Sequence, residues 1–176
     1  MQETLNLCPS SISLAGAEIE LVSLISRENR LKYAISEVQD DYDYIFIDCP
    51  PSLGLLTLNA LTAADTVLVP IQCEYFALEG LSQLMDTVRL VQKHLNKSLK
   101  VEGVVLTMFD ARTNLSIEVA EEVRKHFTNK VYQTLIPRNV RLSEAPSYGL
   151  PIIMYDKNSK GAEAYLQLAD ELINNR

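Results

Sequence analysis

Thr66-Val-Leu-Val-Pro-Ile71 and Val101-Glu-Gly-Val-Val-Leu-Thr-Met108 are two apolar segments rich in β-branched residues, and residues 76–95 lie between them. Short segments that are apolar on both faces are typical of strands in a parallel sheet. The intervening residues repeat apolar side chains every three or four positions, which is the period of a helix: Leu78, Leu81, Met85, Val88, Val91 and Leu95. The three segments predict two parallel strands joined by a right-handed helical crossover.

The same alternation continues on both sides of these segments. Further strands are predicted at residues 5–8, 44–47, 131–136 and 152–155, and helices at 16–36, 55–64, 116–127 and 162–173. We therefore expect an α/β fold, an open and mostly parallel sheet with helices on both faces. Because no internal repeat and no compositional break divides the chain, residues 1–176 are expected to form a single domain.

The composition is that of a folded, soluble protein. Of the 176 residues, 47% are hydrophobic and 22% are charged, close to the globular average. No apolar run approaches the roughly 20 residues of a membrane span, and residues 1–4 do not resemble a signal peptide, so a cytoplasmic location is expected. Cys8, Cys49 and Cys73 lack the spacing of a zinc site or a disulfide framework. The net charge of −7 still allows a local basic patch.

Candidate site residues follow the predicted strands. In open parallel sheets, ligands bind outside the carboxyl ends of the strands. The segments at these ends are residues 48–52, 72–75, 109–112 and 137–141, and the last two contain arginine. We expect the functional site to be built from these segments.

Asp48 ends the apolar segment Tyr44-Ile-Phe-Ile-Asp48-Cys-Pro-Pro-Ser52. An acidic residue at the end of a buried strand is typical of a Walker B element, whose carboxylate holds Mg²⁺ through its water shell. The two prolines stiffen the loop that follows. In the alternative interpretation, Asp48 only caps the next helix.

Several motifs occur in order between residues 12 and 173: Leu14-Ala-Gly-Ala-Glu-Ile-Glu20, Asp48-Cys-Pro-Pro-Ser-Leu-Gly54, Leu61-Thr-Ala-Ala-Asp65, Pro70-Ile-Gln-Cys-Glu-Tyr75, Ala77-Leu-Glu-Gly80, Leu106-Thr-Met-Phe-Asp110 and Ile136-Pro-Arg-Asn-Val-Arg-Leu-Ser-Glu-Ala-Pro146. This series resembles the ParA/Soj family, the deviant-Walker P-loop ATPases of chromosome and plasmid partition. The resemblance implies ATP and Mg²⁺ as cofactors and an ATP-dependent homodimer that binds DNA without sequence preference. It also implies stimulation by a ParB-type partition protein and a cytoplasmic, nucleoid-associated location.

The resemblance also assigns roles to individual residues. Asp48 corresponds to the Walker B carboxylate, Met108 and Pro137 to the adenine pocket, and Arg112 and Arg141 to DNA-contacting arginines. The plainer alternatives are a core methionine, a strand-ending proline and two solvated arginines.

Two further groups are secondary candidates. A larger basic patch would include Arg138, Lys157 and Lys160, and a segment resembling the family's dimer surface contains Glu74, Tyr75 and Glu79. Membrane binding is not expected, because Glu163, Asp170 and Glu171 make the closing helix acidic.

The 176 residues contain no GxxxxGK[ST] motif, and their six glycines do not cluster. The sequence therefore resembles the C-terminal two thirds of a family member, with the N-terminal strands and the Walker A loop missing. We expect that this chain alone does not hydrolyse ATP. The alternative function is a non-catalytic module that binds DNA, a ParB-type partner or a full-length homologue. Since the missing strands would expose an apolar sheet edge, the chain is also expected to self-associate.

Overall fold

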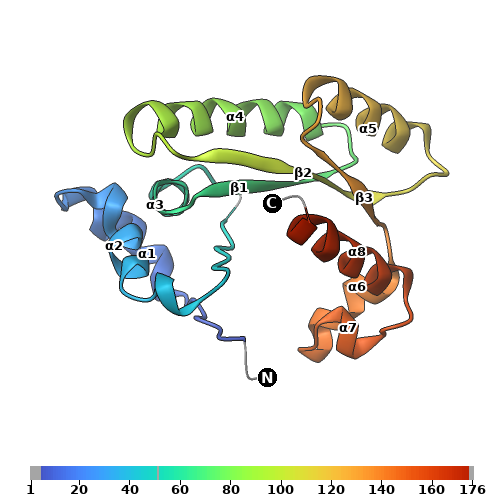
Figure 1. The fold of residues 1–176 in the computed structure, drawn as a ribbon, viewed down its shortest axis with the longest axis horizontal. Coiled ribbons are helices and arrows are strands. Elements are labelled where there is room, and N and C mark those ends of the chain that lie inside the picture. The colour runs from blue at the N-terminus through green and yellow to red at the C-terminus, as the bar shows by residue number, and fades with distance from the viewer. Residues whose placement is uncertain (1–4, 51, 175–176) are drawn as a thin grey trace. The chain divides into compact units, whose positions relative to one another are not determined.

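The computed structural model describes residues 5–50 and 52–174, and within these ranges it contains a sheet of three parallel strands in the order β1-β2-β3 (Figure 1). The strands are β1 (Thr66–Gln72), β2 (Lys100–Phe109) and β3 (Val131–Pro137). The predicted strands at residues 66–71, 101–108 and 131–136 are confirmed, and so is the parallel α/β class. Because the pairing is parallel, the carboxyl ends of the three strands lie at one edge of the sheet.

The described chain divides into two compact units. One unit comprises the residues up to Asp65 together with Thr87–Leu99, and the other comprises Thr66–Asp86 together with the residues from Lys100 onward. The sheet and the segments that follow its strands belong to the second unit. The segment that contains Asp48 belongs to the first unit.

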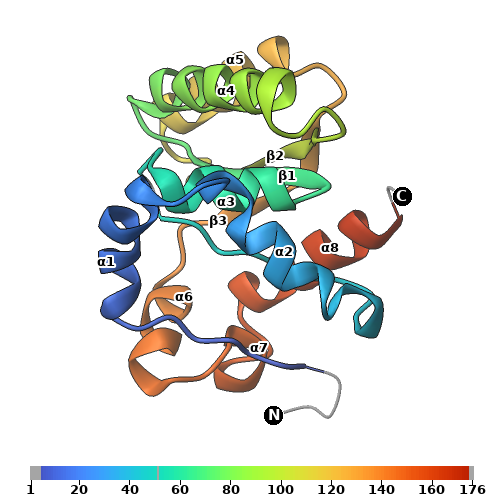
Figure 2. The ribbon, with the colours of Figure 1, turned by 90° about the vertical axis from the view of Figure 1, so that its left-hand side faces the viewer.

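Helices cover both faces of the sheet in the second unit. The part of α4 (Ala77–His94) that belongs to this unit and α5 (Asn114–His126) lie on one side, and α8 (Lys160–Asn174) lies on the other (Figures 1 and 2). These elements confirm the helices predicted at residues 76–95, 116–127 and 162–173. The helices α4 and α8 are both strongly amphipathic, as their sequences predict.

The alternation of side chains along β2 produces the two halves of the core. Val105 packs with Tyr132, Ile136 and Ala164 in a buried cluster between the sheet and α8. Its neighbours Val104 and Leu106 point to the opposite face and are fully buried. The sheet is therefore buried on both faces, as the apolar sequence of its strands predicts.

The outer edge of β3 is held by one carboxylate of α8. Glu171 accepts hydrogen bonds from the backbone N–H of Gln133 (2.7 Å) and of Thr134 (3.0 Å) and from the Thr134 hydroxyl (2.8 Å). These bonds satisfy backbone donors that an edge strand would otherwise leave unpaired. No helix in the described part of the chain, α8 included, is long and apolar enough to cross a membrane.

The strand predicted at residues 152–155 is wrong, because these residues form the short helix α7 (Ile152–Tyr155). The carbonyl of Pro151 accepts hydrogen bonds from the amides of Met154 and Tyr155, which closes a helical turn. An apolar run of four residues fits a strand and a helical turn equally well, so periodicity could not decide between them. Before α7, the chain forms α6 (Val140–Glu144) and a 3₁₀ turn at Ala145–Tyr148.

Besides the part of α4 from Thr87 onward, the described residues of the first unit form the α-helices α1 (Ser13–Glu20), α2 (Arg30–Ser36) and α3 (Leu55–Ala63). The helix predicted at residues 55–64 is confirmed as α3. The single helix predicted at residues 16–36 is wrong in part, because Ser26 has a left-handed backbone (φ 54°) that separates α1 from α2. The Asn59 side chain stabilises this break, since it donates to the carbonyl of Arg27 and accepts from the amide of Leu31.

The strands predicted at residues 5–8 and 44–47 are also wrong, because both segments are irregular. Phe46 is 72% exposed, although the pattern predicts a buried strand. A strand forms only where neighbouring strands take up its N–H and C=O groups, and the described sheet pairs only β1, β2 and β3. The apolar pattern is present in the sequence, but the pairing partner is not among the described residues.

Candidate functional site

Backbone hydrogen bonds connect the segments that follow the three strands at the carboxyl edge of the sheet. The amide of Cys73 donates to the carbonyl of Thr107 (3.0 Å), which extends the pairing of β1 with β2. The amide of Arg138 donates to the carbonyl of Phe109 (3.0 Å), which does the same for β2 and β3. Three of the four segments in which the site is expected, residues 72–75, 109–112 and 137–141, therefore lie at one edge of the sheet, whereas Asp48 of the fourth segment belongs to the other unit.

Asp110 and Arg112 form a bidentate ion pair directly after β2. Nε of Arg112 donates to Oδ1 of Asp110 (2.9 Å), and Nη2 of Arg112 donates to Oδ2 (2.7 Å). The backbone amide of Arg112 also donates to Oδ1 (3.0 Å). These hydrogen bonds from Arg112, and to a smaller extent the charge of Arg138, hold the pKa of Asp110 far below its usual range. The carboxylate is therefore ionised near neutral pH and available to pair with the guanidinium.

A second ion pair joins the segments after β1 and β3. Nη2 of Arg138 lies 3.0 Å from Oε1 of Glu74, although 64 positions separate the two residues in the sequence. Both side chains are more than half exposed, so the pair contributes little to stability. It does place a second arginine, Arg138, at the same edge as Arg112.

Arg141 lies in α6, where two carboxylates face its guanidinium. Nη1 of Arg141 donates to Oε2 of Glu144 (2.8 Å), and Nε lies 3.4 Å from Oδ2 of Asp156. The hydroxyl of Tyr155 donates to the same Oε2 of Glu144 (3.0 Å). The hydrogen bond to Glu144 is the main cause of a raised pKa of Arg141, and the same bond lowers the pKa of Glu144.

Met108 and Pro137, the two residues assigned to an adenine pocket, lie at the ends of neighbouring strands. Both are half-buried, and Pro137 is the last residue of β3, where it stands opposite Phe109. Met108 has a left-handed backbone (φ 54°), which is uncommon for a residue other than glycine. Backbone strain of this kind concentrates at functional sites. The strain favours a role for this strand end, although the adenine contact itself stays a prediction.

Asp48 is exposed and lies in the irregular segment of the other unit. Its Walker B role stays a prediction. Of the two prolines that follow it, Pro51 lies outside the described residues.

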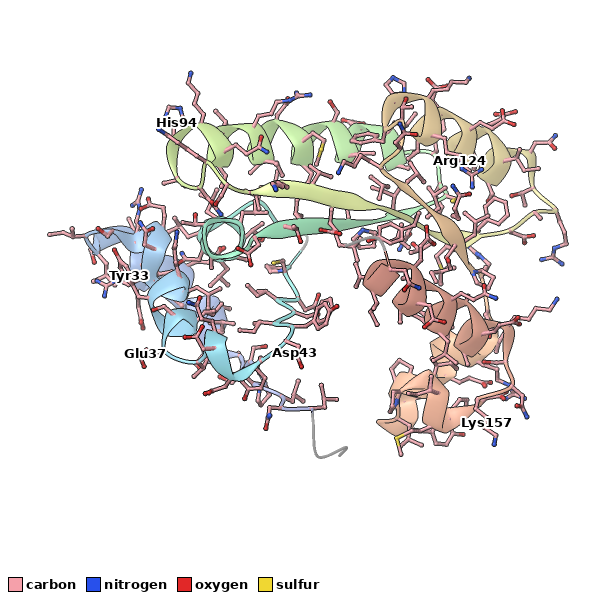
Figure 3. The ribbon with its side chains drawn as sticks, in the orientation of Figure 1. Tyr33, Glu37, Asp43, His94, Arg124 and Lys157 are labelled. Atoms are coloured by element: carbon pink, nitrogen blue, oxygen red, sulfur yellow. The ribbon has the colours of Figure 1, made fainter. Side chains whose placement is uncertain are left out.

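Sequence reasoning did not identify Glu144 and Asp156, the two carboxylates that face Arg141. Glu144 lies three residues after Arg141 on the same helix, and this spacing was a usable signal. Asp156 had no such signal, because it reaches Arg141 only through the turn of α7, which was predicted as a strand. Lys157, the other candidate in this region, is exposed in the loop between α7 and α8 (Figure 3). Within the described ranges no group of three His, Cys, Asp or Glu side chains is arranged to hold a metal ion.

Comparison with known proteins tests the resemblance. A family model described as an AAA domain matches residues 1–101. The sporulation initiation inhibitor protein Soj of Bacillus subtilis is 69% identical over 173 residues, which cover 98% of this chain and 68% of Soj. The chromosome partitioning protein ParA of Myxococcus xanthus is 59% identical over 169 residues, which cover 96% of this chain and 60% of ParA.

A similar solved structure is that of cobyrinic acid a,c-diamide synthase from Mycobacterium smegmatis with bound ADP and magnesium. It superposes with a TM-score of 0.78 at 40% identity and covers 94% of this chain and 60% of the synthase. The chain thus spans about two thirds of the length of the proteins it matches. Because Soj is 69% identical over 98% of this chain, the chain belongs to the ParA/Soj family of P-loop chromosome-partitioning ATPases.

Proposed function

We propose that this chain is the C-terminal part of the ATPase domain of a chromosome-partitioning protein, in which an ATP-dependent homodimer binds DNA without sequence preference. In this proposal a ParB-type partner stimulates hydrolysis, and the protein acts in the cytoplasm on the nucleoid. The observation that carries the proposal is the 69% identity with Soj over 173 residues. Because the chain spans about two thirds of its relatives, these activities are proposed for the whole protein.

The DNA contact is assigned to Arg112 and Arg141. The Arg112 side chain is 87% exposed at the end of β2, and the half-exposed Arg141 is the second residue of the short helix that follows β3. Arginine binds phosphate through charge and parallel N–H donors, so such contacts are sensitive to salt and indifferent to base sequence. Arg138, Lys157 and Lys160 would extend the same surface.

The residues of this chain supply only part of a binding site for ATP and Mg²⁺. Met108 and Pro137 offer a strained, half-buried strand end for the adenine, and Asp48 offers an exposed carboxylate for hydrated Mg²⁺. Nothing in the 176 residues supplies a phosphate-binding loop with its lysine. When bound to the whole protein, Mg-ATP would supply the switch that closes the homodimer. This chain alone is proposed not to turn over ATP.

The test is DNA binding by the pure chain over a series of salt concentrations, with and without Mg-ATP, and with phosphate release measured in parallel. The variant Arg112→Glu/Arg141→Glu should abolish binding, because it reverses both proposed phosphate contacts. The control variant Lys93→Glu/Lys97→Glu makes the same change in net charge at two exposed lysines of the other unit. It should bind like the unaltered chain, and no protein in the series should release phosphate.

Two outcomes would contradict the proposal. Equal loss of binding in both double variants would mean that net charge, and not these arginines, controls DNA binding. Mg²⁺-dependent turnover by the pure chain would contradict the need for a Walker A loop. Binding that depends on the arginines but ignores ATP would favour the alternative function, a non-catalytic interaction module.

A further inference from the structure

Each candidate DNA-binding arginine is already occupied by carboxylates of the same unit. Arg112 uses Nε and Nη2 in a bidentate pair with Asp110. Arg141 faces both Glu144 and Asp156, at 2.8 and 3.4 Å. Arg112 and Asp110 together have a net charge of zero, and Arg141 with Glu144 and Asp156 has a net charge of −1. Within these two groups, the carboxylates therefore offset the charge of the arginines.

Asp110 is the fixed member of its pair, and Arg112 is the mobile member. The Asp110 side chain is 17% exposed, whereas that of Arg112 is 87% exposed. The turn that carries Asp110 is closed by the hydrogen bond from the Arg112 amide to Oδ1 and by bonds from Thr113 to the carbonyl of Asp110. The guanidinium can leave by rotation of its own side chain, while the carboxylate stays at the end of β2.

The carboxylates around Arg141 are held in a comparable way. Tyr155 donates its hydroxyl to Glu144, and Oδ1 of Asp156 accepts from the amide of Asn158. Their charges cannot move far when a phosphate approaches. Within the Debye length of about 8–10 Å, such charges repel a phosphate and offset part of its attraction to the arginine.

We infer that Asp110, Glu144 and Asp156 compete with DNA phosphate for Arg112 and Arg141, and thereby set the strength and salt dependence of DNA binding. The inference rests on the proposed function, because it takes the two arginines as the DNA contacts. These carboxylates are positioning residues that do not touch DNA. Phosphate must displace an internal partner from each arginine, and part of the electrostatic gain of binding is lost in that exchange.

The experiment replaces each carboxylate by its amide. Asp110→Asn keeps the Oδ1 acceptor for the Arg112 amide, so the turn is retained while the charge is removed. The triple variant Asp110→Asn/Glu144→Gln/Asp156→Asn removes all three charges. The control Asp170→Asn makes the same single charge change at an exposed carboxylate of α8. Binding of a duplex of arbitrary sequence is measured between about 50 and about 200 mM salt.

We expect Asp110→Asn to bind DNA more tightly than the unaltered chain at low salt. One more effective positive charge steepens the salt dependence by a slope of roughly 0.9, so binding should fall by an extra factor of roughly three between the two salt concentrations. The triple variant should show a larger effect in the same direction, and Asp170→Asn should show none. In an Arg112→Ala background, Asp110→Asn should change the affinity less than it does in the unaltered chain, because the competition for Arg112 is gone.

The failure of this inference is distinguishable from failure of the proposed function. If Arg112→Glu/Arg141→Glu abolishes binding but Asp110→Asn behaves like Asp170→Asn, the arginines bind DNA and the competition is refuted. If Asp110→Asn binds more weakly, the carboxylate assists the arginine and the inference is equally wrong. If no protein binds DNA, including the triple variant, the inference is refuted for this chain, whereas the proposed function, which assigns DNA binding to the ATP-bound dimer of the whole protein, is not.

Discussion

Tyr132 shows how a single residue can be optimal for packing and unfavourable for hydrogen bonding. It is 4% exposed, and its hydroxyl has no hydrogen-bond partner among the residues that the structure describes. Burial, and then the charges of Glu102 and Glu171, raise the pKa of this phenol. The ring lies directly over Gly103, where a Cβ would stand 2.5 Å from Cε2 of the tyrosine. The ring is therefore required by the packing, and the hydroxyl is not.

Tyr132→Phe should stabilise the chain by about 1–2 kcal/mol, because it removes a buried hydroxyl without a partner and keeps the ring. Gly103→Ala should destabilise it by about 1–3 kcal/mol, since the new methyl group would overlap the Tyr132 ring and the carbonyl of Lys130. Urea denaturation at neutral pH measures both changes. A loss of stability in Tyr132→Phe would show that the hydroxyl is satisfied, for example by a buried water.

Sequence separation decided which residue pairs could be predicted. Asp110 and Arg112 are two positions apart, so any turn after β2 brings them together, and both lay in a predicted site segment. Glu74 and Arg138 are 64 positions apart, and only the strand order β1-β2-β3 makes them neighbours. The left-handed backbone of Met108 could not be predicted at all, because the sequence has no glycine there to signal it.

At the scale of elements, Glu171 attaches α8 to the edge strand β3. Burial disfavours its charged form, but the amides of Gln133 and Thr134 and the Thr134 hydroxyl outweigh this effect and lower the pKa of Glu171. A carboxylate whose pKa is lowered on folding stabilises the native state above its ordinary pKa of 4.5. This stabilisation is lost as the pH falls through the lowered native value.

Glu171→Gln should lower the free energy of unfolding by about 1–3 kcal/mol at pH 7, because one carboxylate oxygen becomes an NH₂ group that faces backbone donors. The difference from the unaltered chain should shrink as the pH falls below about 4.5, since Glu171 itself then becomes protonated. Denaturant titrations at several pH values measure this difference. The control Glu163→Gln lies on the exposed face of the same helix and should change stability little at any pH. A difference that stays constant with pH would contradict the charge-based explanation.

The elements that the sequence predicted correctly are those whose partners are present in the described chain. β1, β2, β3, α4, α5 and α8 all contribute buried apolar side chains, so periodicity and structure agree. Residues 44–47 have an equally clear strand pattern, but no described strand pairs with them. Residues 16–36 failed for another reason, because the Asn59 side chain of α3 binds backbone groups where the helix breaks. Neither cause is visible in a local pattern.

At the scale of the whole molecule, the chain is shorter than the proteins it matches and exposes many large apolar side chains. It spans 68% of Soj and 60% of the Myxococcus ParA. Within the described ranges β1 pairs with β2 alone, so one side of β1 is unpaired in the sheet. Ile12, Ile19 and Phe46 are each more than 70% exposed. Unpaired strand edges and apolar surface of this kind promote association between chains.

The isolated chain should therefore self-associate, and sedimentation velocity at micromolar concentration should detect species heavier than its 19.8 kDa monomer. Phe46→Lys should shift the distribution toward the monomer, because it places a charge in the exposed segment whose sequence is that of a strand. Leu90→Lys is the matched control, since Leu90 is 60% exposed on α4, outside any strand or predicted strand. A monomeric unaltered chain at these concentrations would refute the prediction. An equal shift in both variants would mean that general surface hydrophobicity, and not the strand-like segment, drives the association.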